Sequence, residues 1–451
     1  MLSIADLNNI IGASEQTMAN TAIRGYSIDS RTVKPGDVFF AIKGEKTDGH
    51  RYIAEAEKKG AIAYVVNRNL CDHSMLSLEN IMCVDNTISA LQSVARYIRS
   101  QRHSSTIAIT GSCGKTTVKD LLTEVLKKKY ATARNEGNLN NHLGAPLSLL
   151  NTSDDHQIYI AEMGASKKGD IAELCSIVQP QTGIITNVCA SHLQGFGSLQ
   201  TVYETKAELG EYIGRHGGTI IADADDDNLM DILKKFSSTI VSFGMKKDAD
   251  ISAQIVDDDD SEMIVRINQT SDVKINKRAV LNIKNVLAVI AAASLYDMEL
   301  NDYKDVFINF NPPQGRFSLT EAGKYIVVDD SYNANPASFE NAITLFTHIK
   351  HKGRKICVCG DMLELGAESA QLHKQIGDKL SQSAIDLVVG IGEGGCLIAD
   401  VCKSSNNVMS SYGVSNNSEA VDILHQNLKD NDMILFKGSR GMKLEEVIAQ
   451  L

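Results

Sequence analysis

The residues best placed to do chemistry form a short run that contains two glycines, a lysine and hydroxyl side chains. The run consists of Gly111, Ser112, Cys113, Gly114, Lys115, Thr116 and Thr117. It follows an apolar stretch, residues 106–109, that predicts a buried strand, and it precedes apolar residues at helical spacing from Val118 to Leu126. A glycine turn between strand and helix directs backbone N–H groups and the positive end of the helix dipole at phosphate oxygens. The run therefore predicts a nucleoside triphosphate site, with Lys115 on the outer phosphates and Thr116 on magnesium.

The loop is a short variant of the usual phosphate loop, because the residue five positions before Gly114 is Ile109 and not glycine. The alternative interpretation is a plain glycine turn that merely links a strand to a helix. That interpretation leaves Lys115, Thr116 and Thr117 unexplained, so nucleotide binding is favoured. We assign Cys113 no catalytic role, since a small residue tolerated between backbone donors accounts for it.

Other polar side chains come directly after predicted strands. Glu162 follows the apolar run 158–161, and His192 ends the segment that follows residues 183–186. Because ligands of open α/β sheets bind at the carboxyl ends of strands, Glu162 could hold magnesium opposite the loop and His192 could contact metal or phosphate. The alternatives are a strand-end acid facing water and a structural histidine. Lys206 lies in a helical pattern and, taken alone, is a surface lysine.

Predicted strands and helices alternate along the chain and would hold these groups in place. Residues 26–66 alternate apolar runs with turns, which predicts a small mixed α/β module. Central strands are expected at residues 158–161, 183–186, 219–222 and 239–242. Later strands are expected at residues 325–328, 356–359, 387–389 and 433–436. Helical patterns between them predict a central parallel sheet flanked by helices and a second open α/β sheet.

The predicted fold class is therefore α/β with three domains. A small mixed α/β N-terminal domain, residues 1–84, precedes a central P-loop ATPase-type parallel sheet flanked by helices, residues 85–313. A C-terminal Rossmann-like α/β domain, residues 314–451, follows the loop signals Pro312, Pro313 and Gly315. The acidic run from Asp257 to Asp260 is interpreted as a solvated turn and not as a metal site.

Composition excludes several classes of protein. The chain has 451 residues and a formal net charge of -11, which argues against nucleic acid as the main partner because phosphate backbones are held by clustered Lys and Arg. The sequence contains neither an N-terminal leader pattern nor an apolar run of membrane-spanning length, so a cytoplasmic protein is expected. Nine cysteines without zinc spacing predict reduced core thiols, with Cys357 and Cys359 on one face of a strand.

Taken together, these segments resemble the Mur ligase family, the ATP-dependent ligases that build the peptide of bacterial cell-wall precursors. The resemblance runs through nearly the whole chain. It is carried by residues 110–117, 135–146, 162–164, 187–193, 205–208 and 313–316. Within the family, the chain is most similar to the member that adds D-alanyl-D-alanine to UDP-N-acetylmuramoyl-tripeptide. That closer similarity is carried by residues 28–31, 329–338, 360–366 and 437–442.

The resemblance implies a function for each domain: uridine diphosphate binding for the first, ATP binding for the second, and D-Ala-D-Ala binding with closure for the third. ATP-binding residues would be Gly111, Ser112, Cys113, Gly114, Lys115, Thr116, Thr117, Asn282, Asn285, Arg316 and Asp330. The catalytic residues would be Lys115, Glu162, His192 and Lys206. The UDP-substrate would contact Ser30, Arg31, Asn138 and Asn141, and the D-Ala-D-Ala side would be formed by Tyr332, Asn333 and Asn335.

The implied cofactors are ATP and two Mg²⁺ ions. Thr116 and Glu162 would bind the ion on ATP, and His192 and Lys206 would bind the second, with Lys206 present as a carbamate. The implied protein is a monomeric bacterial cytoplasmic ligase without nucleic-acid or membrane partners. Two positions depart from the family pattern near the adenine: Leu281 stands where histidine is usual and Asp223 where asparagine is common.

Two alternatives stay open. One is another Mur-type or folylpolyglutamate-type ligase that adds a single amino acid. The other is a catalytically silent nucleotide-binding or scaffold protein that keeps the fold, against which the presence of Lys115, Glu162, His192 and Lys206 speaks. Diaminopimelate and lysine are both open as the third residue of the tripeptide.

Overall fold

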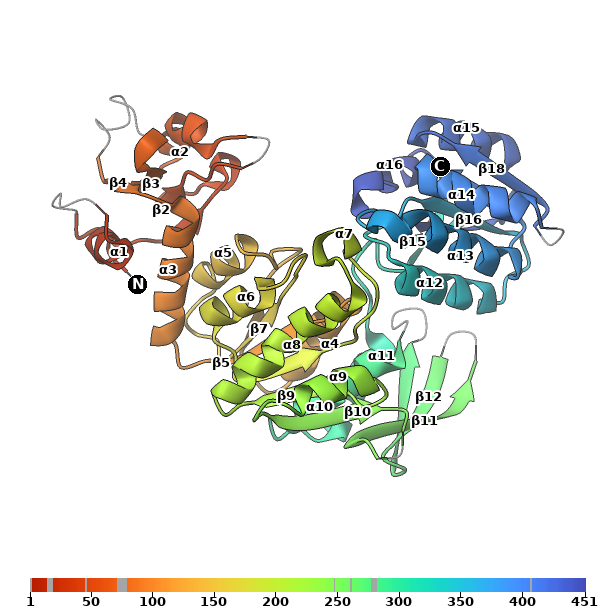
Figure 1. Ribbon diagram of the computed structural model, residues 1–451, viewed down its shortest axis with the longest axis horizontal. Helices are drawn as coiled ribbons and strands as arrows, with labels where there is room; N and C mark the ends of the chain where they lie inside the picture. The colour runs from red at the N-terminus through yellow and green to blue at the C-terminus, as the bar shows by residue number, and fades with distance from the viewer. Residues whose placement is uncertain are drawn as a thin grey trace.

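The computed structural model describes residues 2–13, 19–44, 47–70, 79–246, 248–259, 262–276, 282–405 and 408–451. Three sheets follow one another along the chain, and the N-terminal and C-terminal units flank the central one (Figure 1). The predicted α/β class with three domains is confirmed. No helix within the described ranges is long and apolar enough to cross a membrane.

The N-terminal sheet has four parallel strands in the order β1-β2-β3-β4. The strands are β1 (Gly25–Ser27), β2 (Asp37–Phe40), β3 (Ala63–Asn67) and β4 (Ile81–Val84). The helical segments are α1 (Ile4–Ile11), η1 (Ser30–Thr32), η2 (Gly49–Tyr52), α2 (Ile53–Lys58) and η3 (Arg68–Leu70). Helix α3 (Thr87–Gln101) begins where the Asn86 side chain accepts hydrogen bonds from the N–H groups of Ile88 and Ser89. The helix packs against α1 and against the central domain, so it joins the two units.

The central sheet has the strand order β13-β12-β11-β10-β9-β8-β5-β7-β6. All neighbours from β6 to β11 are parallel, and β11, β12 and β13 form an antiparallel extension. The parallel strands are β5 (Ser105–Thr110), β6 (Thr132–Arg134), β7 (Ile158–Glu162), β8 (Thr182–Ile185), β9 (Thr219–Asp223) and β10 (Thr239–Gly244). The extension consists of β11 (Ile251–Asp258), β12 (Glu262–Ile267) and β13 (Ser271–Asn276). Asp257 and Asp258 therefore belong to a strand end and not to a turn, and Asp260 lies outside the described residues.

Helices cover both faces of the central sheet because its strands bury side chains on both sides. Ile107 and Ile109 of β5 belong to one apolar cluster, and Ala108 belongs to the other. The helices are α4 (Lys115–Leu126), α5 (Gly144–Leu150), α6 (Asp170–Val178), α7 (Leu193–Phe196), α8 (Leu199–Arg215), α9 (Asp227–Leu233), α10 (Ile283–Ser294) and α11 (Leu300–Asn309). This two-sided burial is what the continuous apolar runs in the sequence predict for a parallel sheet.

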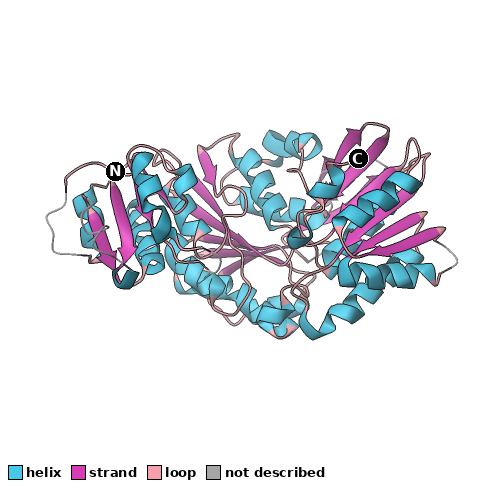
Figure 2. Ribbon diagram, turned by 90° about the horizontal axis from the view of Figure 1, so that it is seen from above, coloured by secondary structure: helices cyan, strands magenta, loops and turns pink. Residues whose placement is uncertain are grey.

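The C-terminal sheet has the order β14-β15-β19-β16-β17-β18, in which only the β14–β15 pair is antiparallel. The strands are β14 (Ser318–Ala322), β15 (Tyr325–Asp330), β16 (Lys355–Gly360), β17 (Leu387–Ile391), β18 (Ser410–Val414) and β19 (Met433–Lys437). The helices are α12 (Pro336–His348), η5 (Gly366–Glu368), α13 (Ser369–Ser381), α14 (Gly392–Lys403), α15 (Asn417–Asn427), η6 (Arg440–Met442) and α16 (Glu445–Ile448). Helices lie on both faces of the sheet (Figure 2).

The strand expected at residues 106–109 is present, and so are the eight strands expected in the central and later parts of the chain, with small shifts at their ends. The edge strands β6 and β18 were not predicted, because each is short or polar and exposes one side. The domain boundaries at residues 84 and 313 stay predictions; they lie between β4 and α3 and between α11 and β14.

Candidate functional site

The conformation of the phosphate loop between β5 and α4 depends on two glycines. Gly111 has φ +144° and Gly114 has φ +81°. A Cβ atom would lie 2.0 Å from Thr186 Oγ1 at Gly111 and 2.5 Å from Asn285 Oδ1 at Gly114. Both the backbone angles and the close contacts therefore exclude larger residues. Among the described residues no side chain caps the N-terminus of α4, so the N–H groups of its first turn are available to phosphate oxygens.

The Lys115 ammonium lies against the loop that precedes it. Its Nζ is 2.8 Å from the carbonyl oxygen of Gly111 and 3.2 Å from that of Ser112. Neutral carbonyls are weaker partners for an ammonium than phosphate oxygens are. The structure thus places this lysine where a bound phosphate would attract it.

The Glu162 carboxylate at the end of β7 is the centre of a buried polar network. The Thr116 hydroxyl donates to Glu162 Oε2 over 2.9 Å, and Arg316 Nη2 donates to the same hydroxyl over 2.8 Å. Asn140 Nδ2 donates to the other carboxylate oxygen over 2.8 Å. Glu162 is 3% exposed, which excludes the interpretation as a solvent-facing acid. The fold brings together three predicted site residues that are distant in the sequence.

Besides Asn140, sequence reasoning missed two further residues that hold Glu162. The buried Lys119 ammonium lies 3.6 Å from Glu162 Oε2 and 3.5 Å from the carbonyl oxygen of Gly137. Asn135 Oδ1 accepts from the Glu162 N–H over 2.8 Å, and Asn135 Nδ2 donates to the Glu162 carbonyl over 3.2 Å. One signal was available: Lys119 follows Lys115 by four residues and so shares its helix face.

His192 and Lys206 lie before α7 and on α8. His192 has φ +51°, and its Nδ1 pairs with Glu364 of the C-terminal domain. Lys206 is 2% exposed, so its interpretation as a surface lysine is wrong. Its Nζ lies 5.6 Å from the ring centroid of Phe196, and within the described part of the chain no group hydrogen-bonds or ion-pairs with it. Burial, together with the nearby Lys115 charge, lowers the pKa of Lys206 to about 7.

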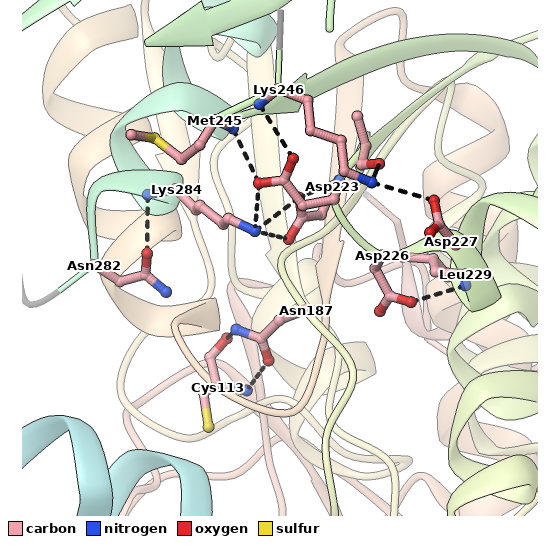
Figure 3. A network of polar contacts seen from close by, with 12 residues as sticks. Cys113, Asn187, Asp223, Asp226, Asp227, Leu229, Met245, Lys246, Asn282 and Lys284 are labelled. Atoms are coloured by element: carbon pink, nitrogen blue, oxygen red, sulfur yellow. Dashed lines mark hydrogen bonds and ion pairs between the residues drawn. The ribbon is translucent and has the colours of Figure 1, made fainter. Parts of the chain in front are cut away.

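A second polar cluster lies at the carboxyl end of β9, beside the N-terminus of α10 (Figure 3). Lys284 Nζ is 2.8 Å from Asp223 Oδ2 and 2.8 Å from Asp225 Oδ2. Burial raises the pKa of Asp223 in spite of its bonds to Lys284. The carboxylate that replaces the expected asparagine at position 223 is thus paired with a cation.

The other residues predicted for this end lie on α10 or next to it. Asn282 Oδ1 accepts from the Lys284 N–H over 2.9 Å and so caps the helix. Asn285 packs against Gly114 of the phosphate loop. Leu281 lies outside the described residues.

Among the predicted residues of the C-terminal domain, Arg316 and Asn335 contact the phosphate loop. The Arg316 guanidinium lies 4.0 Å from the ring centroid of Tyr332, and Asn335 Nδ2 lies 3.1 Å from Cys113 Sγ. Asp330 at the end of β15 pairs over 2.6 Å with the buried Lys437, which also donates to the Asn333 carbonyl over 3.1 Å. Lys437 belongs to the segment 437–442 that carries part of the resemblance, but its pairing with Asp330 was not predicted.

The four residues predicted for the UDP-substrate form two separate pairs in the chain, and each residue has contacts of its own. Ser30 Oγ donates to Glu55 Oε2 over 2.9 Å, and Arg31 pairs with Asp29 at the surface. Asn141 Oδ1 accepts from the N–H groups of Leu143 and Gly144, and Asn138 is exposed. In the described ranges no hydrogen bond links the first pair to the second, and their shared role stays a prediction.

The oxygen atoms near the loop suit Mg²⁺. This ion prefers hard oxygen ligands and is usually held by one or two protein groups together with substrate phosphates and water. Thr116 and Glu162 offer a hydroxyl and a carboxylate side by side. The described residues contain no cluster of three or more His, Cys, Asp or Glu side chains that could hold a metal by themselves. The fit is therefore to an ion that shares its ligands with a triphosphate.

A phosphate loop at the carboxyl edge of a parallel sheet, with a buried acid beside it and an arginine from the next domain, defines a P-loop enzyme that uses a nucleoside triphosphate. Family models match most of the chain. They are "Mur ligase family, catalytic domain" at residues 22–97, "Mur ligase middle domain" at 109–293 and "Mur ligase, glutamate ligase domain" at 315–440. The chain belongs to the Mur ligase family, as the resemblance predicted.

Individual relatives match over their full length. The chain is 32% identical to the UDP-N-acetylmuramoyl-tripeptide--D-alanyl-D-alanine ligase of Bacillus subtilis (strain 168), over 99% of this chain and 98% of that protein. The crystal structure of MurF from Acinetobacter baumannii has a TM-score of 0.88 and 28% identity, covering 100% of this chain and 98% of that one. MurF ligase from Thermotoga maritima in complex with ADP has a TM-score of 0.82 and 28% identity, covering 96% and 98%.

Proposed function

We propose that this protein joins D-alanyl-D-alanine to UDP-N-acetylmuramoyl-tripeptide and converts ATP to ADP and phosphate. The observation that carries the proposal is the full-length match to ligases of this name. The network around the loop supports it, since Thr116, Glu162 and Arg316 are the groups that a phosphoryl transfer requires. The product is the pentapeptide precursor of peptidoglycan.

The chemistry must activate a carboxylate, because its oxygen is too poor a leaving group for direct attack by an amine. A terminal carboxylate oxygen of the tripeptide attacks the γ-phosphorus of ATP, and ADP leaves. The amine of D-Ala-D-Ala then attacks the carbonyl carbon of the acyl phosphate, loses a proton, and phosphate leaves from the tetrahedral intermediate. Negative charge is spread first over the transferred phosphoryl group and then on the former carbonyl oxygen, so fixed positive groups stabilise both steps.

The residues of this chain divide that work. Lys115 leaves the loop carbonyls for the outer phosphates, and Arg316 adds positive charge from the side of the C-terminal domain. Asn140 and Lys119 hold the Glu162 carboxylate in place. Thr116 and Glu162 would bind the Mg²⁺ on ATP, and His192 and Lys206 would bind a second ion. When bound, Mg²⁺ neutralises the charge that develops on the phosphoryl oxygens.

Carbamylation of Lys206 would give the second ion an oxygen ligand, which an ammonium cannot supply. The side chain is buried beside Phe196 and lacks a carboxylate partner within the described residues. Burial without a counter-charge favours the neutral amine, which is the form that reacts with carbon dioxide. Crystals grown in saturating bicarbonate should show density for a carbamate on Nζ, and the Lys206→Arg variant should not. A bare amine in the unmodified protein under those conditions would contradict the proposal.

We assign the uridine diphosphate to residues 1–84, ATP to residues 85–313 and D-Ala-D-Ala to residues 314–451 of a monomer. Closure of the last domain would exclude water from the acyl phosphate. Arg316 and Asn335 reach the phosphate loop from that domain or its border, which supports this assignment. Small-angle scattering should show a smaller radius of gyration with an ATP analogue and both substrates. An unchanged scattering curve would contradict closure.

The direct test is an assay of ADP formation with purified UDP-muramoyl-tripeptides, one ending in diaminopimelate and one in lysine. ADP should form with D-Ala-D-Ala and not with single amino acids. Turnover with a single amino acid alone would instead favour the other Mur-type or folylpolyglutamate-type ligases. No product with any acceptor would favour a catalytically silent protein.

A further inference from the structure

Two cysteines from separate segments meet at the phosphate loop. Cys113 belongs to the loop, and Cys189 belongs to the segment between β8 and α7 that carries His192. Their sulfur atoms lie 3.9 Å apart, and both residues are partly exposed. The backbones are held side by side, because the Ser112 hydroxyl accepts from the Cys189 N–H over 3.0 Å and donates to the Cys189 carbonyl over 2.9 Å.

We propose that Cys113 and Cys189 form a thiol-modification site, at which a low-molecular-weight disulfide oxidises the pair to an intramolecular disulfide and thereby blocks nucleotide binding. A disulfide bond is about 2.05 Å long, so the sulfur atoms must approach by roughly 2 Å. Both residues lie outside helices and strands, where rotation of the side chains and small backbone shifts can provide that approach.

The surroundings of the pair give the two thiols different roles. Hydrogen bonding with Cys189, and then with the Asn335 amide, lowers the pKa of Cys113 to about 6 although the residue is only partly exposed, and the Lys115 charge acts in the same direction. The bond to Cys113 raises the pKa of Cys189. Because the Asn335 amide also donates to Cys113 Sγ over 3.1 Å, Cys113 is the attacking thiolate in this proposal and Cys189 the resolving thiol.

The reaction balances with a disulfide RSSR as the oxidant. The Cys113 thiolate attacks one sulfur of RSSR, so that a mixed disulfide forms and RS⁻ leaves. Cys189 loses its proton and attacks Cys113 Sγ, which forms the internal disulfide and releases the second RS⁻. The protein loses two electrons, RSSR gains them, and the two thiol protons end on two molecules of RSH.

The bridge would change the loop in two ways. Cys113 Sγ must leave Asn335 Nδ2, which lies 3.1 Å away and is one of the contacts between the loop and the C-terminal domain. The bond would also draw the loop toward the segment that carries Asn187, whose Oδ1 already accepts from the Cys113 N–H over 2.9 Å (Figure 3). Because phosphate binding depends on the position of backbone donors in this loop, both changes oppose it.

A second thiol pair in the same chain serves as an internal control. Cys357 and Cys359 have sulfur atoms only 3.4 Å apart, but both are fully buried in the core of the C-terminal domain. A dissolved oxidant does not reach them in the folded protein, and burial raises the pKa of Cys359. Distance alone would favour reaction at this pair, and exposure favours reaction at Cys113 and Cys189.

The test uses glutathione disulfide on the full-length protein, with peptide mapping under non-reducing conditions and titration of ATP binding by calorimetry. We expect a peptide that links Cys113 to Cys189, free thiols at Cys357 and Cys359, and ATP affinity lowered roughly tenfold or more through lost bonds to charged phosphate oxygens. Dithiothreitol should restore the affinity. Neither readout depends on which acceptor the enzyme uses, so this result is distinct from that of the ligase assay.

Two variants separate the roles of the thiols. Cys189→Ser should keep the untreated activity, form no bridge and retain one glutathione on Cys113. Cys113→Ser should show the same ATP affinity before and after treatment. The proposal is overturned if the linked peptide does not form, or if it forms and ATP affinity is unchanged. It is also overturned if glutathione disulfide lowers the ATP affinity of Cys113→Ser as much as that of the protein with both cysteines.

Discussion

The phosphate end and the base end of the nucleotide site are built differently. At the phosphate end, Thr116, Glu162 and Arg316 form one buried network from two domains, with Lys115 beside it. At the end where we place the adenine, Asp223 and Lys284 form an ion pair that is partly open to solvent. Charge changes during the reaction only at the first end. Changes there should therefore lower kcat, whereas changes at the second should alter ATP affinity.

The largest effect is expected from Lys115→Met. Removal of a positioned cation from the transferred phosphoryl group should lower kcat by about 100- to 1,000-fold. Lys127→Met, at an exposed lysine that follows the same helix, is the matched control and should be nearly neutral. Steady-state ADP formation measures both. If kcat falls no more in Lys115→Met than in Lys127→Met, Lys115 does not act on the transferred phosphoryl group.

Glu162→Gln should have the next largest effect, because it keeps the hydrogen-bonding shape but removes the charge that attracts Mg²⁺. We expect kcat to fall about 10- to 100-fold and the Mg²⁺ concentration for half-maximal rate to rise. Glu124→Gln, at an exposed acid on α4, controls for loss of charge alone. An unchanged Mg²⁺ requirement would contradict the placement of the ion.

The free energy of unfolding should show whether Lys119 stabilises the Glu162 carboxylate. Both side chains of the Lys119–Glu162 pair are nearly inaccessible, so either Lys119→Met or Glu162→Gln leaves a buried charge with fewer partners. In a double-mutant cycle by urea unfolding, we expect a coupling energy of about 1–3 kcal/mol. Strictly additive effects would show that Lys119 does not stabilise the carboxylate.

The smallest effect is expected at the base end. Lys284→Ala should raise KM for ATP about three- to tenfold and leave kcat within about twofold, because an ion pair with partial exposure contributes little. Lys246→Ala removes an exposed lysine that pairs with Asp227 nearby and is the control. A large fall in kcat for Lys284→Ala would show that the two ends are not separate.

Features of the site that depend on residues close together in the sequence could be predicted. The spacing of Gly111, Gly114 and Lys115 and the position of Glu162 after an apolar run predict the loop and the strand-end acid, because adjacent elements fix both. Contacts between distant segments were not predictable in this way. Nothing local marks Glu364 as the partner of His192 or Lys284 as the partner of Asp223.

The burial of charged side chains was the second feature that could not be predicted from the sequence. Lys206 was interpreted as a surface lysine and Lys119 was not singled out, because lysine is almost never fully buried. The structure buries both, since each faces the sheet edge where the site is formed. The helical pattern of the sequence indicated the helices, but it did not indicate that the polar positions facing this edge are buried.

The most direct test of the account follows oxygen-18 placed in the terminal carboxylate of the UDP-muramoyl-tripeptide. If the carboxylate is phosphorylated before the amine attacks, one labelled oxygen must appear in the released inorganic phosphate with each peptide bond formed. Mass spectrometry of the phosphate should therefore detect the label at full stoichiometry. Turnover to pentapeptide with unlabelled phosphate would contradict the acyl phosphate and, with it, the roles assigned to the phosphate end.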